Sequence, residues 1–585
     1  MIQKVSPYFC FLPLLISAIL MSCTPLPLSI IEPAEGEVFG FNALIPLTTQ
    51  DAVQSSIHWE DGSGSMLGTG SSVRVILFPG TYTIKVFKDG VFQDSRSITI
   101  LPPVIEAGSF YEQVHTKEEE TLPLPEGMYD ASFINVSSLP LSVEYSSSVT
   151  GKSALQKAED ESTDMGDIRL AVKESFYASN SRRAIPSSFS TQPALAYEKG
   201  QQKEFYVPDI TGSSSDPSII TAELYGTSTD ALLWIDVNAS ISAEDKALLW
   251  KSADAVIMRS KTLWGGWGPT ASDSHIHILV TPKLNEYNIA VGFFNPYDLF
   301  PKQTDKNYPF YNPYSNECNL VTLAMPSSSS SSFSLSSICA TVSHELSHLI
   351  RYQRKSRQAI LAGDANPPVE KLFLDEGLAH LAETLCGYGI SGGNILFAQK
   401  YLNTSYAYSF SGVNIYGMED STGRRGAMLL LLSFLFWDKG GLQLHEDGSI
   451  TDAGGCAFLQ SLVQTSKTGW DALESSIGQS KKDVLRTWLR NTMTQSKGAY
   501  IIDPFTNEPL GISAFFGPYI YTDGSSIELS GLTPCNPDEQ LRCASESVFY
   551  YSSLTVTEFP KIHISSNSAE SEKYLGSFFS MWLKK

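Results

Sequence analysis

Basic residues, cysteines and long apolar runs are all scarce in this 585-residue sequence, and each scarcity narrows the class of protein. Lys and Arg number 41 against 62 Asp and Glu, so the formal net charge is −21. A nucleic-acid partner is therefore not expected, because binding phosphates requires a basic face. The apolar run Ala427 to Trp437 is too short to span a bilayer and indicates a buried helix. Hydrophobic residues make up 42% of the chain, which is typical of a globular protein.

Only eight cysteines are present, and none of their spacings is typical of a zinc knuckle. Two of them, Cys10 and Cys23, belong to the N-terminal segment described next. An even number remains, which permits disulfides in an exported chain. Cys535 and Cys543 are close in sequence, with Pro537 between them, and are predicted to form a local disulfide.

The N-terminus has the composition of an export signal. Lys4 precedes an apolar stretch from Phe9 to Leu20, and the stretch ends in Leu20-Met-Ser-Cys23, which resembles a bacterial lipobox. Residues 1–22 are therefore predicted to be a lipoprotein signal peptide. A lipid on Cys23 would anchor the protein to the membrane of a bacterial cell envelope, with the outer membrane as the expected site. An ordinary secretory signal is the alternative.

The stretch from Ala340 to Ile350 contains His344, Glu345 and His348 in the pattern H-E-x-x-H. In a helix the two histidines lie one turn apart on the same face, so both imidazoles can reach one metal ion. Glu345 then lies beside the metal, where a carboxylate can accept a proton from water. The helix is supported by an apolar stripe made of Ile338, Val342, Leu346, Leu349 and Ile350.

A second predicted helix, from Lys371 to Cys386, offers a third ligand. Catalytic zinc needs three protein ligands and an open position for water. The suitable side chains in this stretch are those of Asp375, Glu376, His380 and Glu383. We favour Glu376, because Gly377 beside it removes side-chain bulk and lets the two helices approach closely. Asp375, His380 and Glu383 are then candidates for contacts behind the ligands, with Asp375 hydrogen-bonding a ligand histidine. A surface helix without metal is the alternative.

Further short motifs surround these two helices: Phe205-Tyr-Val-Pro208, Ala231-Leu-Leu-Trp-Ile-Asp-Val237, His275-Ile-His-Ile-Leu-Val280, Val291-Gly-Phe-Phe-Asn-Pro-Tyr-Asp298, Ser315-Asn-Glu317, Gly387, Tyr401-Leu402 and the run from Gly426 to Trp437. Together with the helices they resemble the hyicolysin-type zinc metallopeptidases, which are gluzincin-like enzymes, over residues 205 to 500. Members commonly read W-L-N-E-G-L where this chain reads Phe373-Leu-Asp-Glu-Gly-Leu378, so the glutamate is kept and its neighbour differs.

The resemblance implies a zincin-like α+β fold with one catalytic zinc ion. It implies His344, His348 and Glu376 as the zinc ligands and Glu345 as the general base. The implied activity is that of a metalloendopeptidase, a hydrolase that cleaves peptide bonds of protein substrates.

Other residues are candidates for supporting roles. In metallopeptidases a Tyr, His or Arg typically donates a hydrogen bond to the oxyanion of the transition state. Tyr416 is the first candidate for this role, ahead of Tyr388 and Arg424. His275 and His277 alternate with apolar residues in a predicted strand, and we interpret them as a solvated strand face rather than as metal ligands.

The expected fold is multi-domain, with an α+β zincin-like metallopeptidase domain flanked by β-sandwich modules. Residues 23–101 are predicted to be an immunoglobulin-like sandwich, since Asp89-Gly90 separates two alternating runs. Residues 102–200 are expected to hold a second β-module with a disordered linker at 146–168 and 178–192. The metallopeptidase domain is expected at 201–500, and a small C-terminal β-domain at 501–585.

The competing hypothesis is a catalytically inactive or latent peptidase-like lipoprotein that acts as a surface adhesin or binding scaffold. The β-modules and the lipid anchor suit both hypotheses. The joint presence of the three expected ligands and the base favours the enzyme.

Overall fold

The structure is a computed structural model that describes residues 28–50, 56–145, 149–150, 197–270, 274–307, 311–493, 501–503, 505–506, 508–510, 518–520, 526–528, 532–535, 541–557, 560–566 and 576–585. The predicted signal peptide, Cys23 and nearly all of the predicted linker lie outside these residues. The chain divides into two compact units, which are described separately.

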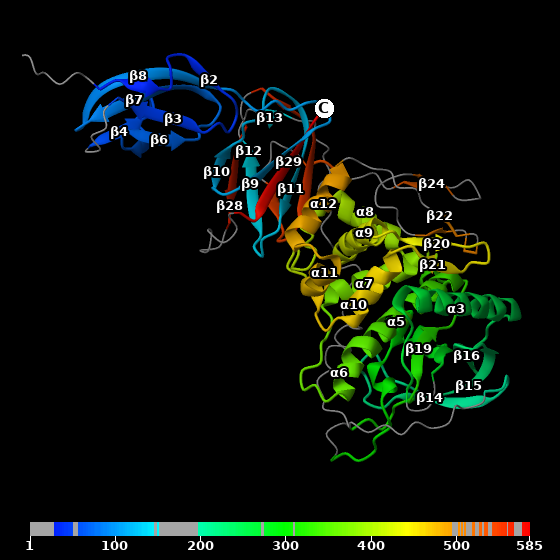
Figure 1. The fold of residues 1–585 in the computed structure, drawn as a ribbon. Coiled ribbons are helices and arrows are strands. Elements are labelled where there is room, and N and C mark those ends of the chain that lie inside the picture. The colour runs from blue at the N-terminus through cyan, green and yellow to red at the C-terminus, as the bar shows by residue number, and fades with distance from the viewer. Residues whose placement is uncertain are drawn as a thin grey trace, which may run out of the picture. The chain divides into compact units, whose positions relative to one another are not determined.

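The first unit holds a β-sandwich, as predicted for residues 23–101 (Figure 1). Its smaller sheet has the order β1 (Ile30–Glu32), β3 (Ile45–Thr49), β6 (Ser72–Val75). Its larger sheet has the order β2 (Glu37–Phe39), β8 (Val91–Ile100), β7 (Gly80–Lys88), β4 (Ile57–Glu60), β5 (Met66–Thr69). The expected hairpin is formed at Asp89-Gly90, where Lys88 pairs with Val91. Alternate residues such as Ile84 and Val86 are buried in the core with Trp59.

A second sandwich combines strands from two distant parts of the sequence. One sheet has the order β10 (Glu119–Thr121), β28 (Lys561–Ser565), β12 (Leu141–Tyr145), β26 (Leu541–Cys543). The other has the order β13 (Val149–Thr150), β27 (Val548–Val556), β11 (Gly127–Asn135), β29 (Phe578–Lys584), β9 (Phe110–His115). Figure 1 shows the early and late strands interleaved.

The prediction of two separate β-domains, at 102–200 and 501–585, is therefore wrong. β11 pairs antiparallel with β29 from Tyr129 to Asn135, so neither stretch forms these sheets alone. The physical reason is that each strand exposes backbone groups that its own neighbours in sequence do not satisfy. Strand patterns in the sequence show that strands exist, but they do not show which strands pair.

The region between these two sets of strands has a six-stranded mixed sheet. Its order is β14 (Gln202–Val207), β15 (Ser218–Thr227), β16 (Ala231–Asp236), β17 (Ile276–Thr281), β19 (Asn319–Ala324), β18 (Gly292–Phe294). β16, β17 and β19 run parallel and every residue in them is buried. That burial explains their continuous apolar runs. β18 is the last strand in this order and pairs antiparallel with β19.

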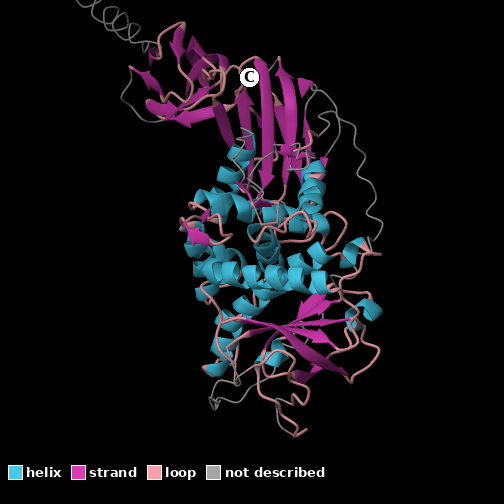
Figure 2. Ribbon diagram, turned by 90° about the vertical axis from the view of Figure 1, so that its right-hand side faces the viewer, coloured by secondary structure: helices cyan, strands magenta, loops and turns pink. Residues whose placement is uncertain are grey.

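Helices cover one face of this sheet and form a layer of their own (Figure 2). The main helices are α3 (Ala243–Trp264), α5 (Leu335–Arg351), α7 (Leu372–Leu385), α8 (Asn394–Asn403), α9 (Thr422–Asp438), α10 (Gly455–Gln464), α11 (Gly469–Ile477) and α12 (Lys481–Met493). Shorter ones are α4 (Lys283–Tyr287), η2 (Pro296–Leu299), η3 (Ser331–Phe333), the π-helix η4 (Tyr352–Arg357), α6 (Gln358–Leu361) and η5 (Ser405–Ala407). In the described part of the chain, no helix has the length and apolar character needed to cross a membrane.

Three small hairpins complete the described elements. They are β20 (Leu442–Leu444) with β21 (Ile450–Asp452), β22 (Ile501–Ile502) with β23 (Pro509–Leu510), and β24 (Pro518–Ile520) with β25 (Ser526–Glu528).

The packing of α7 differs from the prediction about Gly377. A Cβ on Gly377 would lie 2.8 Å from Cβ of Met428 and 3.0 Å from a methyl group of Leu432, both on α9. The missing side chain therefore lets α7 approach α9, and not α5 as we expected. Gly426 of α9 allows a similar close approach to the backbone of Phe397 on α8. Small residues thus seat α9 between its two neighbours.

The turn between β26 and β27 fastens the second sandwich to the helices. The Glu546 carboxylate accepts a hydrogen bond from Ser411 and pairs with Lys481 at the start of α12. The backbone amide of Phe410 donates to the Glu546 carbonyl at 3.2 Å, and that of Ala544 donates to Tyr406 at 2.9 Å. The loop before α9 is thus held from one side by the sandwich.

The predicted disulfide between Cys535 and Cys543 is not formed, because both residues carry free, buried thiols. Cys543 lies on β26, and its thiol donates a hydrogen bond at 3.3 Å to the carbonyl of Leu141 on the neighbouring strand β12. The backbone amide of Cys535 donates to Tyr550 of β27 at 2.7 Å. Strand pairing, which the spacing of two cysteines does not reveal, directs the Cys543 thiol elsewhere.

Trp582 offers a test of the shared sandwich. It lies on the late strand β29, is fully buried, and its ring contacts Tyr129 and Phe133 of the early strand β11. We expect Trp582→Ala to lower the free energy of unfolding by about 3–5 kcal/mol, because a large cavity opens inside the sheet packing. Chemical denaturation followed by circular dichroism measures the change. Trp582→Phe keeps most of the buried area and should cost clearly less; equal losses for both variants would contradict this packing.

Candidate metal centre

Helix α5 places His344 and His348 side by side. Ser334 begins the helix by accepting a hydrogen bond from the Ser337 amide at 3.2 Å, and no Pro or Gly interrupts it. The two imidazole rings lie one turn apart, with their centroids 4.9 Å from each other. Both residues are buried, with 6% and 7% of their surface exposed. The predicted helix and the common face of its two histidines are present.

Helix α7 brings Glu376 to both rings. Its Oε2 lies 3.4 Å from His344 Nε2, and its Oε1 lies 3.4 Å from His348 Nε2. Two ring nitrogens and a carboxylate thus converge from two packed helices, with all ligand atoms within 4.8 Å of one another. Such a set of two imidazoles and one carboxylate is one that zinc accepts in proteins, with room for a further ligand.

The other nitrogen of each imidazole is held by a second carboxylate. Glu383 Oε1 lies 2.6 Å from His344 Nδ1, and Asp375 Oδ2 lies 2.9 Å from His348 Nδ1. This arrangement fixes the orientation of each ring and makes its Nε2 a better donor to a cation. Asp375 and Glu383 therefore lie where a supporting role requires them, while Glu376 alone faces both Nε2 atoms.

His380 belongs to a second group that could hold a metal, together with His344 and Glu383. Its Nδ1 lies 3.4 Å from Glu383 Oε1, and its ring centroid is 4.9 Å from that of His344. In that group, however, Glu383 would have to bind the cation and His344 Nδ1 at once. In the group of His344, His348 and Glu376, both Nε2 atoms face the Glu376 carboxylate while both Nδ1 atoms are held by other carboxylates, so it is the better candidate.

Two arginines that were not among the candidates from the sequence complete the cluster. Arg425 of α9 places Nη1 2.5 Å from Glu376 Oε2, and Asp420 holds the same guanidinium through Nη2 at 2.5 Å. Arg351 of α5 places Nη2 2.7 Å from Asp375 Oδ1. The available signal was the pair Arg424-Arg425 at the start of an otherwise apolar helix, because a buried arginine requires a carboxylate partner.

The charges set the ionisation of the cluster. Burial by itself would raise the pKa of Glu376, but Arg425 and His348 outweigh it and hold that pKa well below its usual value. Burial would lower the pKa of His348, but the carboxylates of Asp375 and Glu376 outweigh it and raise that pKa. For His380 burial prevails and lowers the pKa. Glu376 is therefore ionised, and a proton on His348 competes with any cation.

Glu345 lies next to the cluster on the same helix and is fully buried. Its Oε2 accepts a hydrogen bond at 3.0 Å from the backbone amide of Phe294, in the edge strand β18. The candidate base is therefore anchored to the strand at the margin of the sheet. Its carboxylate is therefore positioned by a backbone amide and not by a mobile side chain.

The remaining sequence candidates lie elsewhere or stay predictions. Tyr416 is 39% exposed, and its backbone amide donates to the Asn414 side chain at 2.9 Å. Its role at the oxyanion stays a prediction. The interpretation of His277 as solvated is wrong. The residue is fully buried, and its Nδ1 accepts a hydrogen bond from the Trp234 indole at 3.1 Å. Tyr197 and Trp234 pack on its ring, which a strand pattern alone does not reveal.

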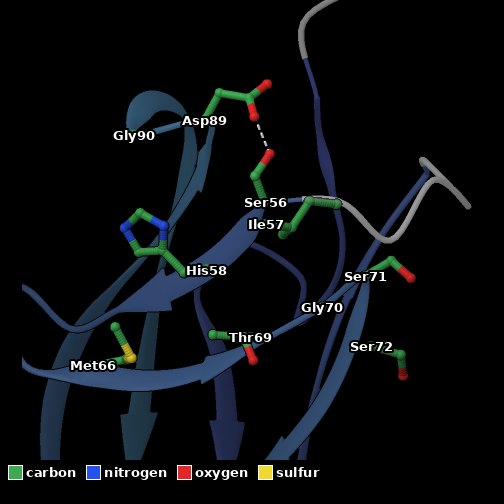
Figure 3. Close-up of a pocket in the computed structure, with 10 residues that line it drawn as sticks. All are labelled: Ser56, Ile57, His58, Met66, Thr69, Gly70, Ser71, Ser72, Asp89 and Gly90. Carbon is green, nitrogen blue, oxygen red and sulfur yellow. Dashed lines mark hydrogen bonds between the residues drawn. The ribbon is translucent and has the colours of Figure 1, made fainter.

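A separate hollow of about 700 Å³ lies on the first sandwich (Figure 3). The ring of His58 is stacked on Phe87 with centroids 4.8 Å apart, and Asp89 accepts a hydrogen bond from Ser56. Among the described residues, the groups able to hold a metal ion lie in the α5–α7 cluster and not in this hollow.

The described chain is thus a multi-domain protein in which β-sandwiches accompany a helical and mixed-sheet region with a buried His/Glu cluster. No protein-family model matches the sequence. No curated protein matches it either. Among solved structures, the fibronectin(III)-like modules of Clostridium thermocellum CbhA are similar to 23% of this chain and 74% of theirs, with 13% sequence identity and a TM-score of 0.12.

The raised pKa of His348 predicts how cation binding depends on pH. Below that pKa the imidazole is protonated and must lose its proton to bind a metal, so affinity should fall as the pH drops through a value above the ordinary 6.5. The same proton stabilises the metal-free fold below pH 6.5, and this stabilisation is lost as the pH rises through the raised pKa.

Titration with Co²⁺ from about pH 5.5 to about pH 8.5 measures the midpoint of this transition. Asp375→Asn removes one carboxylate that raises the pKa, so its midpoint should move to lower pH. A midpoint that is unchanged in this variant would contradict the assignment.

Proposed function

We propose that this protein is a zinc-dependent endopeptidase similar to the hyicolysin-type enzymes, with a zincin-like catalytic domain in the region of 201–500. The observation that carries the proposal is the geometry of the cluster. The Nε2 atoms of His344 and His348 both lie 3.4 Å from Glu376 oxygens, on two packed helices. The residues fit zinc in kind, number and burial, since two neutral imidazoles and one carboxylate leave a position for water.

Zinc bound at this cluster would supply a Lewis acid that polarises the scissile carbonyl and a water molecule. The chain's own residues do the rest. Glu345 accepts a proton from the attacking water while the water oxygen forms a bond to the carbonyl carbon. Glu345 then gives that proton to the leaving nitrogen as the C–N bond breaks. Asp375 and Glu383 hold the imidazoles in place throughout.

The substrate class comes from the resemblance to the hyicolysin-type enzymes, which implies cleavage of peptide bonds within protein substrates. Near the candidate base, β18 ends the six-stranded sheet, and the Phe294 amide donates to Glu345. All three residues of β18 are buried, so this hydrogen bond holds the Glu345 carboxylate in place rather than a substrate strand.

The variant Glu345→Gln tests the base. We expect the rate of casein cleavage to fall about 10²–10⁴-fold, because the glutamine cannot accept a proton. Zinc should remain bound at one ion per chain. Fluorescent casein degradation and metal analysis by mass spectrometry give the two readouts. Glu376→Gln serves as the matched comparison and should lose both zinc and activity. A Glu345→Gln variant that cleaves at the wild-type rate would refute the proposed function.

We further propose that the enzyme is tethered to the bacterial envelope by a lipid on Cys23. The lipobox-like Leu20-Met-Ser-Cys23 supports this. In cells fed radioactive palmitate, the full chain should carry label and sediment with membranes. Cys23→Ser should lose the label and leave the membrane fraction, because acylation requires the thiol. Equal labelling of both proteins would contradict the anchor.

A further inference from the structure

Arg425 occupies an unusual place beside the proposed zinc ligand. It lies in the first turns of α9 and is almost wholly buried, with 2% of its surface exposed. Its Nη1 donates to Glu376 Oε2 at 2.5 Å and lies 3.4 Å from His380 Nε2. A guanidinium is always charged and only donates hydrogen bonds, so it contacts the carboxylate without being able to bind a metal.

Asp420 fixes this guanidinium from the other side. Arg425 Nε donates to both Asp420 oxygens, at 3.1 and 3.2 Å, and Nη2 donates to Oδ2 at 2.5 Å. The start of α9 is itself well defined, because Ser421 accepts a hydrogen bond from the Arg424 amide at 3.3 Å. A two-point contact of this kind leaves the planar fork little freedom.

This geometry distinguishes between two roles for Arg425. An arginine that stabilises a transition state needs a nitrogen directed at the substrate. Here Nε and Nη2 are engaged by Asp420, and Nη1 is engaged by Glu376. The guanidinium therefore acts on the carboxylate and not on the reacting atoms.

We infer that Arg425, held by Asp420, is a positioning residue that sets the orientation of the Glu376 carboxylate toward His344 and His348. The inference rests on the proposed function, because it assigns a task in that same zinc site. Loss of Arg425 leaves Glu376 free to turn between rotamers, so the site loses a preformed ligand. Contacts behind a metal ligand typically change metal affinity or activity by about 10–100-fold.

The test compares zinc affinity in Arg425→Ala, Arg425→Lys and the wild type by competition with a chromogenic chelator. We expect the alanine variant to bind zinc about 10–100-fold more weakly. The lysine variant should be intermediate, since it keeps the charge and loses the fork. The absorption spectrum of bound Co²⁺ should change in the alanine variant, because the spectrum reports ligand geometry. Added guanidinium ion at millimolar concentration should restore part of the affinity.

Arg259→Ala is the matched control. Arg259 is also almost fully buried, and it pairs with a buried carboxylate, Asp503, at 2.5 Å. Its loss should lower the thermal midpoint of the metal-free protein without changing the Co²⁺ spectrum. If Arg425→Ala does not fold, Asp420→Asn takes its place, because it keeps the arginine and weakens its support; a weaker zinc affinity is expected there as well.

The outcomes separate the inference from the proposed function. If Glu376→Gln loses zinc while Arg425→Ala and Asp420→Asn keep wild-type affinity and spectrum, the positioning role is wrong and the peptidase proposal stands. If the wild-type chain binds no zinc, both fall. The inference is supported if the Arg425 and Asp420 variants bind zinc more weakly with an altered Co²⁺ spectrum while Arg259→Ala shows neither change.

Discussion

A buried carboxylate shared by two imidazoles and one guanidinium is the constraint on which the helical region depends. Glu376 is 4% exposed, and an isolated carboxylate at such depth costs several kcal/mol unless it is paired and hydrogen-bonded. Glu376 lies on α7, and its partners come from two other helices: His344 and His348 from α5, and Arg425 from α9. These helices must therefore meet at one place, and small residues such as Gly377 make that meeting close enough.

The second sandwich also helps to hold the loop that carries Asp420. The loop before α9 carries Asp420, and the turn between β26 and β27 contacts an earlier part of that loop through Glu546 and Ser411. That turn belongs to a sandwich whose strands come from both sides of the helical region in the sequence. The domain with the cluster is thus inserted into the sandwich. Because the late strands pair with early strands in both of its sheets, this sandwich needs both parts of the chain.

Some features of the fold and of the cluster follow from the sequence, and others do not. The helices at 335–351 and 372–385 follow from apolar periodicity, and the convergence of His344 and His348 follows from a four-residue spacing. Arg425 was missed because its partner Glu376 is 49 residues away, and no local pattern links them. The interleaved strands, the burial of His277 and the free thiols of Cys535 and Cys543 were missed for the same reason.

The sequence by itself determined what each segment is: which runs are helices or strands, where hairpins turn, and which side chains share a face. Short-range sterics and burial patterns decide these features, and they act within a few residues. Only the tertiary structure decided which segments meet. It selected Glu376 to face both rings, assigned Asp375 and Glu383 to one imidazole each, and set Arg425 on the carboxylate. Buried charges must find partners wherever the fold brings them, and that choice is made in space rather than along the chain.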